Sequence, residues 1–138
     1  MGRILAIDYG KKRTGIAVTD PLQIIASGLT TVETRNLWKF IADYLIAEDV
    51  ETIVVGEPKQ MNYTESEIGP VIHTFVDKLK AAYPKLKIDR VDERFTSKMA
   101  FQTMIDSGLS KGKRRNKALV DEIAATIILQ TYLSRNDY

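Results

Sequence analysis

The chain has 138 residues, of which 44% are hydrophobic and 28% are charged, and this composition fits a soluble globular protein of one domain. It contains no cysteine, which excludes disulfides, thiolate zinc sites and cysteine nucleophiles, and no apolar run approaches the ~20 residues of a membrane span. The N-terminus reaches Asp8 too early for a signal peptide, so we expect a cytoplasmic protein without membrane contact.

The net charge is only +2, but the charge is unevenly distributed. Residues 111–117 contain five of the 20 Lys and Arg residues, and no acid lies between Asp106 and Asp121. Such a cationic segment predicts contact with a polyanion at one place, although it would also suit a solvated loop without a ligand. The candidate phosphate-binding residues here are Lys111, Lys113, Arg114, Arg115 and Lys117.

The first 33 residues predict an antiparallel meander of three strands. Two strands over 3–8 and 14–20 are joined by a turn from Gly10 to Arg13, and a third strand covers 24–33. Thr34 is then a candidate N-cap for a helix over about 35–48.

The remaining residues predict alternating strands and helices. The expected elements are a strand over 51–57, a helix over about 65–82 that starts near Gly69, a strand over 86–92, a short helix over 97–107, and a last helix from an Asn116 cap to about 134. The order βββαβαβαα predicts an α/β domain with a mixed five-stranded sheet and helices on both faces. This is the element order of an RNase H-like domain, and we expect residues 1–138 to form one such nuclease domain.

Three acids stand in settings that predict a function. Asp8 ends the apolar run from Ile4 to Ile7, where a carboxylate is costly unless something pairs with it. Glu93 follows a predicted strand, with Asp92 as a neighbouring candidate for the same role. Asp121 shares a helix face with two alanines and an isoleucine, so this face packs inward. Taken singly, each acid also suits a structural role, as a turn cap or a helix-stabilising charge.

Taken together, the three acids predict a metal-dependent nuclease. Phosphodiester hydrolysis requires an activated water and neutralisation of the scissile phosphate, and two metal ions about 4 Å apart supply both. Carboxylate oxygens suit Mg²⁺ or Mn²⁺. The lone His73 is interpreted as a surface or packing residue, so no histidine site competes with this hypothesis.

Four motifs occur in order along nearly the whole chain. They are Asp8-x-Gly10-x-x-Arg13-x-Gly15-x-Ala17, Val55-Gly56-x-Pro58, Asp92-Glu93-Arg94-x-Thr96-Ser97 and Lys117-x-x-x-Asp121-x-x-Ala124-Ala125-x-x-Ile128-Leu129. Each motif alone is weak, but the ordered set resembles the YqgF family, the Holliday-junction-resolvase-like proteins that are also called pre-16S rRNA nucleases.

The resemblance implies an RNase H-like nuclease that matures the 5′ end of 16S rRNA, with metal held by Asp8, Glu93 and Asp121. It also implies a set of residues near the phosphate or orienting Glu93, namely Arg13, Arg94, Thr96, Ser97 and Lys117. The expected partners are structured RNA or branched DNA and a precursor of the small ribosomal subunit, bound by a monomer or a homodimer.

One residue departs from the family pattern. Glu57 stands where the family usually has an apolar residue, and it is interpreted either as an extra metal ligand, as a competitor of Glu93, or as a solvent-facing acid.

Three other functions remain open on the sequence. A four-way DNA junction resolvase would use the same chemistry, and a nucleic-acid or ribosome-associated binding module would need no chemistry at all. A sugar-kinase or actin-like ATPase, which the motif at Asp8 also resembles, would require two such domains.

Overall fold

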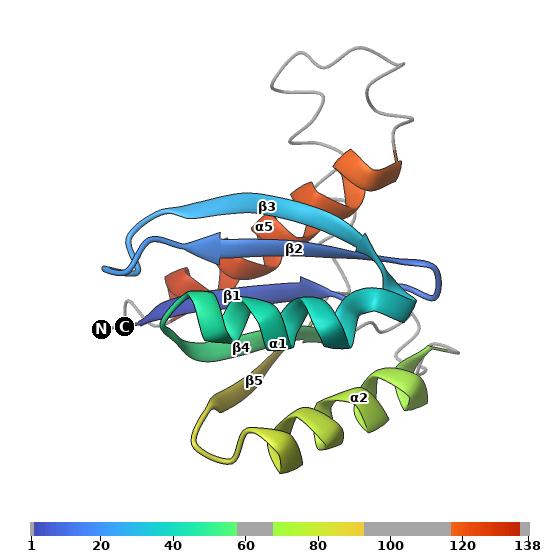
Figure 1. The fold of residues 1–138 in the computed structure, drawn as a ribbon. Helices are drawn as coiled ribbons and strands as arrows, with labels where there is room; N and C mark the ends of the chain where they lie inside the picture. Colours follow the sequence, from blue (N-terminus) through green and yellow to red (C-terminus); the bar gives the residue numbers. More distant parts are fainter. Residues whose placement is uncertain (1, 58–67, 93–116, 136–138) are drawn as a thin grey trace.

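The computed structural model describes residues 2–57, 68–92 and 117–135. Five strands form one sheet in the order β3-β2-β1-β4-β5 (Figure 1). The strands are β1 (Arg3–Asp8), β2 (Arg13–Thr19), β3 (Ala26–Glu33), β4 (Val50–Glu57) and β5 (Lys87–Asp92). The first three pair antiparallel, and β4 and β5 extend the sheet parallel to β1, so the predicted mixed five-stranded sheet is confirmed.

Helices cover both faces of the sheet, as predicted. The helical elements are η1 (Thr34–Asn36), α1 (Leu37–Ala47), α2 (Gly69–Ala82) and α5 (Lys117–Arg135). Helices α1 and α2 lie on one face, and α5 crosses the other (Figure 1). Within the described ranges, no helix has the length and hydropathy of a membrane span. The expected helix over 97–107 and the Asn116 cap lie outside the described residues.

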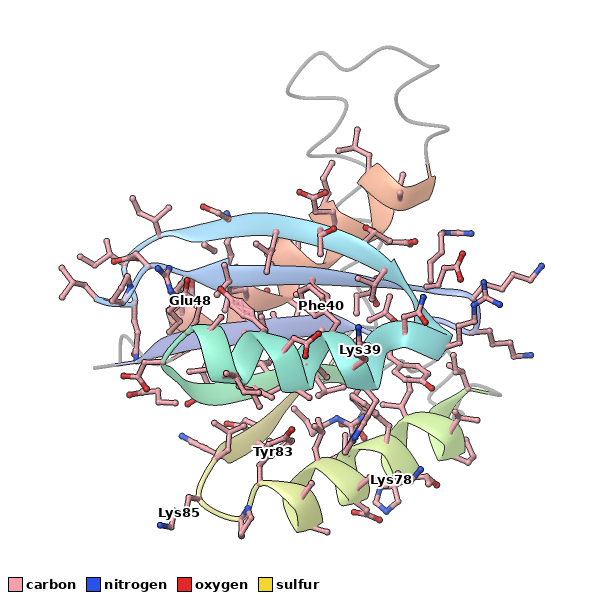
Figure 2. All side chains as sticks on the ribbon, in the orientation of Figure 1. Lys39, Phe40, Glu48, Lys78, Tyr83 and Lys85 are labelled. Carbon is pink, nitrogen blue, oxygen red and sulfur yellow. The ribbon has the colours of Figure 1, made fainter. Side chains whose placement is uncertain are left out.

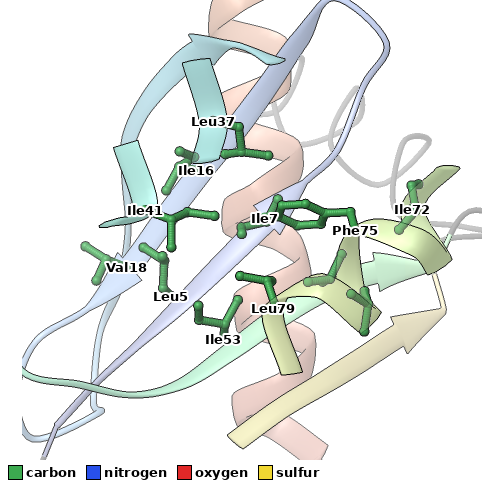
Figure 3. Close-up of a cluster of buried hydrophobic side chains, with 12 residues drawn as sticks. Leu5, Ile7, Ile16, Val18, Leu37, Ile41, Ile53, Ile72, Phe75 and Leu79 are labelled. Carbon is green, nitrogen blue, oxygen red and sulfur yellow. The ribbon is translucent and has the colours of Figure 1, made fainter. Parts of the chain in front are cut away.

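Alternation along the strands divides the apolar residues between two cores. Leu5 and Ile7 of β1 belong to the core under α1 and α2, whereas Ile4 and Ala6 belong to the core under α5. Figure 3 shows the first core, where strand side chains meet those of both helices (for example Phe75 of α2). Because successive strand residues point to opposite faces, this assignment also gives the face of the residues at the end of each strand.

Two predicted boundaries were wrong for local reasons. The strand expected from residue 24 begins at Ala26, because the Asp20 carboxylate organises the preceding loop: it accepts backbone N–H bonds from Leu22, Ile24 and Ile25 at 3.1, 2.9 and 2.8 Å. Thr34 does not cap α1. Its hydroxyl donates to the Gly10 carbonyl oxygen at 2.6 Å, and a 3₁₀ turn precedes the helix.

Candidate active site

The carboxyl ends of three adjacent parallel strands each carry an acid. Asp8 ends β1, Glu57 ends β4 and Asp92 ends β5. Ile7 pairs with Val55, and Glu57 pairs directly with Asp92, so the three acids line one edge of the sheet. Ligands of open α/β sheets bind at this edge.

Strand alternation separates these acids into two groups. Asp8 follows Ile7 and therefore faces the α5 side, with Ala6. Glu57 alternates with Val55, which belongs to the core under α1 and α2, and its partner Asp92 shares that face. This separation favours the interpretation of Glu57 as an acid outside the site formed by Asp8.

Gly15 brings helix α5 close to Asp8. It pairs with Asp8 across β1 and β2, so both residues face α5. A Cβ on Gly15 would lie 1.9 Å from the carbonyl oxygen of Asp121, a distance that no side chain tolerates. The backbone of α5 therefore rests on the glycine, one strand away from Asp8. This close approach brings Asp8 and Asp121, residues 113 positions apart in the chain, to one place on the sheet.

Asp121 is held by an arginine from the neighbouring strand. Arg13 opens β2, and its Nε donates to Asp121 Oδ2 at 3.0 Å. The two side chains retain 37% and 24% of their exposure, so the pair lies at the surface of the site. A first-turn anchor supports the helix, because the Thr31 hydroxyl of β3 donates to the Ala118 carbonyl oxygen at 2.6 Å. The structure thus places two of the three predicted acids and one predicted phosphate-binding residue together.

The turn between β1 and β2 is fastened to the end of β3 by Thr34. Its backbone N–H donates to the Lys12 carbonyl oxygen at 2.9 Å, and its hydroxyl donates to the Gly10 carbonyl oxygen. The buried Thr14 hydroxyl lies 2.9 Å from the Thr34 hydroxyl oxygen. Because the single Thr34 hydroxyl proton is already used, Thr14 is the donor of that bond. These bonds give the residues after Asp8 a defined conformation.

A cationic depression that was not predicted lies at this turn. It measures about 560 Å³ and is lined by Lys11, Lys12, Arg13, Glu33 and Arg35. Figure 2 shows nitrogen-tipped side chains gathered around the β1–β2 turn. The run from Lys11 to Arg13 was a visible signal in the sequence. Arg35 gave no signal, because only the pairing of β2 with β3 brings it there.

Several predicted site residues lie outside the described residues: Glu93, Arg94, Thr96, Ser97, Lys111, Lys113, Arg114 and Arg115. Lys117 is the first residue of α5. His73 is exposed on α2, with its Nε2 3.5 Å from Asp77 Oδ2, as expected for a surface residue.

The chemistry of the described acids suits a divalent cation. Asp8 and Asp121 present hard, partly exposed carboxylate oxygens from the same side of the sheet. In the part of the chain that the structure describes, no three His, Cys, Asp or Glu side chains form a group that could hold a metal ion. The third predicted ligand, Glu93, is not in that part.

Comparisons with known proteins give a consistent result. A family model described as "RuvX: Holliday junction resolvase" matches residues 2–135. A protein of Flavobacterium psychrophilum named "Putative pre-16S rRNA nuclease" is 63% identical over 135 residues, covering 98% of each chain. A protein of Porphyromonas gingivalis with the same name is 58% identical over 137 residues, covering 99% of each.

Two solved structures share the fold at low sequence identity. The fowlpox virus Holliday junction resolvase has a TM-score of 0.61 and 12% identity, covering 96% of this chain and 99% of its own. Thermus thermophilus RuvC in complex with a Holliday junction substrate has a TM-score of 0.57 and 16% identity, covering 99% and 96%. These likenesses establish the RNase H-like fold that the element order predicted.

Proposed function

Because the chain belongs to the RuvX (Holliday junction resolvase) family, we propose that it is a metal-dependent endonuclease that processes the 5′ end of pre-16S rRNA. The observation that carries the proposal is that Gly15 pairs with Asp8 and lies against the backbone of Asp121, whose carboxylate is bonded by Arg13. The choice of RNA as substrate rests on the name shared by the relatives at 58–63% identity. Such an activity would place the protein in the cytoplasm.

Each residue of the site has a distinct part in this proposal. Asp8 and Asp121, with Glu93, would hold Mg²⁺ or Mn²⁺. A bound divalent cation there would offset the negative charge of the scissile phosphate and lower the pKa of a water molecule. Arg13 keeps the Asp121 carboxylate in one orientation and adds positive charge beside the phosphate.

The substrate backbone would be held by cations on both sides of the acids. Lys11, Lys12 and Arg35 line the depression at the β1–β2 turn. From the predicted set, Arg94, Thr96 and Ser97 would act beside Glu93, and the cations of residues 111–117 would border the start of α5. Since these contacts release counterions, affinity for RNA should fall steeply with added salt.

The decisive experiment compares the wild type with Asp8→Asn on a 5′-extended 16S precursor fragment, in Mn²⁺ and in Mg²⁺. Asp8→Asn keeps the shape of the side chain and removes the charge, so we expect cleavage to fall at least 100-fold while RNA binding persists. Asp43→Asn, an exposed acid on α1 that lines neither the acidic site nor the cationic depression, is the matched control and should cleave normally. Equal cleavage by Asp8→Asn and the wild type would contradict the mechanism.

A four-way DNA junction is the second candidate substrate. The description of the family and the two resolvases of like fold favour it. The same variants are therefore tested on a synthetic junction, with the oligomeric state measured by light scattering, because paired cleavage needs two sites. Binding of the RNA precursor without cleavage of either substrate would instead support a non-catalytic binding module.

A further inference from the structure

A hollow opens between α1 and α2 beside the carboxyl end of β1. It measures about 390 Å³, and its walls include Tyr9, Trp38, Phe75 and Lys78. Trp38 is 41% exposed, whereas Phe75 is buried beneath it. The proposed chemistry at Asp8 and Asp121 uses none of these side chains.

We propose that this hollow binds an unpaired nucleobase of the RNA strand whose phosphate is held at the acidic site. The inference rests on the proposed function, because it takes RNA as the ligand of the neighbouring acids. It adds a preference for substrates with a single-stranded nucleotide next to the scissile bond, since a paired base could not enter the hollow.

The aromatic rings are arranged before any ligand arrives. The Tyr9 and Phe75 ring centroids are 5.1 Å apart with planes tilted by 42°, and Trp38 meets Phe75 edge-on at 6.2 Å and 84°. Phe75 is thereby a fixed floor against which the two outer rings are positioned. Aromatic side chains held in this way stack on any nucleobase, because every base has a flat π-face.

The chain connects the hollow to the acids. Tyr9 directly follows Asp8, but Asp8 faces α5 while Tyr9 packs against the core under α1 and α2. An RNA strand that bends around this edge of the sheet can present a phosphate to Asp8 and turn the adjoining base into the hollow. Among the described residues, the end of β1 lies between the two surfaces.

The charges around the hollow favour a polyanion. Thr34 lines the hollow, and the next residue, Arg35, lines the cationic depression with Lys11 and Lys12. On the other wall, the exposed Lys78 of α2 adds a cation (Figure 2). An aromatic floor continuous with lysines and arginines matches a nucleotide, with the base on the rings and the phosphates on the cations.

The experiment uses Trp38, the single tryptophan of the chain, as its reporter. Single-stranded oligoribonucleotide is added to the full chain without divalent metal, and tryptophan fluorescence and the anisotropy of labelled RNA are both recorded. We expect saturable quenching by the oligonucleotide and none by inorganic polyphosphate, which carries charge but no base. RNA binding by anisotropy without quenching would overturn the proposal.

Variants then assign the contact to the hollow. Tyr9→Ala and Trp38→Ala should weaken binding of single-stranded RNA between about fivefold and 100-fold and leave binding of a fully paired duplex unchanged. Lys78→Ala should weaken binding, and Lys80→Ala, an exposed lysine on the same helix that does not line the hollow, should not. Circular dichroism checks the fold of each variant. If a variant fails to fold, quenching of the wild-type protein still tests the proposal.

The outcome is separable from that of the proposed function. Quenching without cleavage of any substrate would support the hollow and contradict the nuclease. Cleavage by the wild type without quenching would support the nuclease and contradict the hollow.

Discussion

Arg13 is the residue that joins the acidic site to the cationic depression. Its ion pair with Asp121 is partly exposed, and pairs of this kind contribute at most about 1 kcal/mol to folding. We therefore expect Arg13→Gln to leave the free energy of unfolding within about 1 kcal/mol of the wild type. Cleavage of the RNA precursor should fall at least tenfold, because Asp121 loses its orienting partner. Urea denaturation and single-turnover cleavage measure the two effects.

A second surface pair controls for this change. Lys39 and Asp43 lie one turn apart on α1, with Lys39 Nζ 3.9 Å from Asp43 Oδ2, and both side chains are exposed. Lys39→Gln should alter neither stability nor cleavage. Wild-type cleavage by Arg13→Gln would show that the pair serves only as a surface contact.

Asp20 predicts a pH dependence of stability. The backbone N–H bond from Ile25, with further bonds from Ile24 and Leu22, lowers the pKa of the Asp20 carboxyl below its ordinary value. A depressed pKa stabilises the folded state at pH values above the unfolded pKa, about 3.9, and this contribution disappears as the pH falls through the folded pKa. The stability advantage of the wild type over Asp20→Asn should therefore be constant from pH 7 to about pH 5 and shrink below about pH 4.

Urea unfolding of both proteins across this range tests the expectation. A difference that stays constant down to pH 2 would mean that the loop does not depend on the charge of Asp20.

Individual residues differ in how far the sequence reveals them. Asp8 and Asp121 could be identified because burying an acid among apolar residues costs free energy, and the apolar pattern around each acid can be read from the sequence alone. Arg35 could not be identified, because its place in the depression depends on the register of β2 with β3. The side of the sheet that Glu57 faces likewise required the register of β4.

At the scale of elements, the position of α5 depends on Gly15. A methyl group there would meet the backbone of Asp121, which cannot swing away without moving the helix. We expect Gly15→Ala to lower the free energy of unfolding by about 1–3 kcal/mol and to reduce cleavage strongly, since Asp121 shifts away from Asp8. Urea denaturation and the cleavage assay measure both.

Gly28 provides the matched comparison. A Cβ there would meet the side chain of Glu122, with its carboxylate oxygen at 2.5 Å, rather than the helix backbone. Because a glutamate side chain can change rotamer, Gly28→Ala should cost less stability and retain cleavage. Equal effects of the two substitutions would contradict the special role of Gly15.

Element types could be read from periodicity, but some boundaries could not. The strand β1 was predicted with its observed limits, because its apolar run ends at a charge. The start of β3 was misplaced, since Ile24 and Ile25 resemble strand residues although their N–H groups bond to the Asp20 carboxylate. A side-chain acceptor of this kind competes with neighbouring strands for backbone N–H groups, and the hydrophobic pattern of the sequence does not reveal it.

At the scale of the whole molecule, one sheet is shared by two cores. Leu79 of α2 and Ile128 of α5 are both fully buried, on opposite faces. Since every strand contributes to both cores or pairs with one that does, we expect a single cooperative unfolding transition. Leu79→Ala and Ile128→Ala should each lower the free energy of unfolding by about 2–5 kcal/mol and move the whole transition.

Two probes follow this unfolding independently. Trp38 fluorescence reports on the layer of α1 and α2, and far-ultraviolet circular dichroism reports on all elements. The two curves should coincide in the wild type and in both variants. A transition in which Ile128→Ala loses circular dichroism before fluorescence would show that the two layers unfold separately.

The architecture as a whole followed from the order of elements. Three strands with short links predicted the antiparallel part, and the later alternation of strands and helices predicted the parallel part. The placement of β4 beside β1, and not at the edge beside β3, sets the acids side by side. That placement depends on which face of the sheet each helix covers. Tertiary packing decides this, so the position of β4 could not be predicted from the sequence.

The row formed by Ala6, Ala17 and Gly28 on three neighbouring strands has an evolutionary consequence. At Ala6 and Ala17, a side chain that grows must be matched by one that shrinks on α5, or the helix lifts and carries Asp121 away from Asp8, whereas at Gly28 the Glu122 side chain can move aside. Among related chains, such positions should change in compensating pairs, and their history of substitution should be slow even though none of them takes part in chemistry.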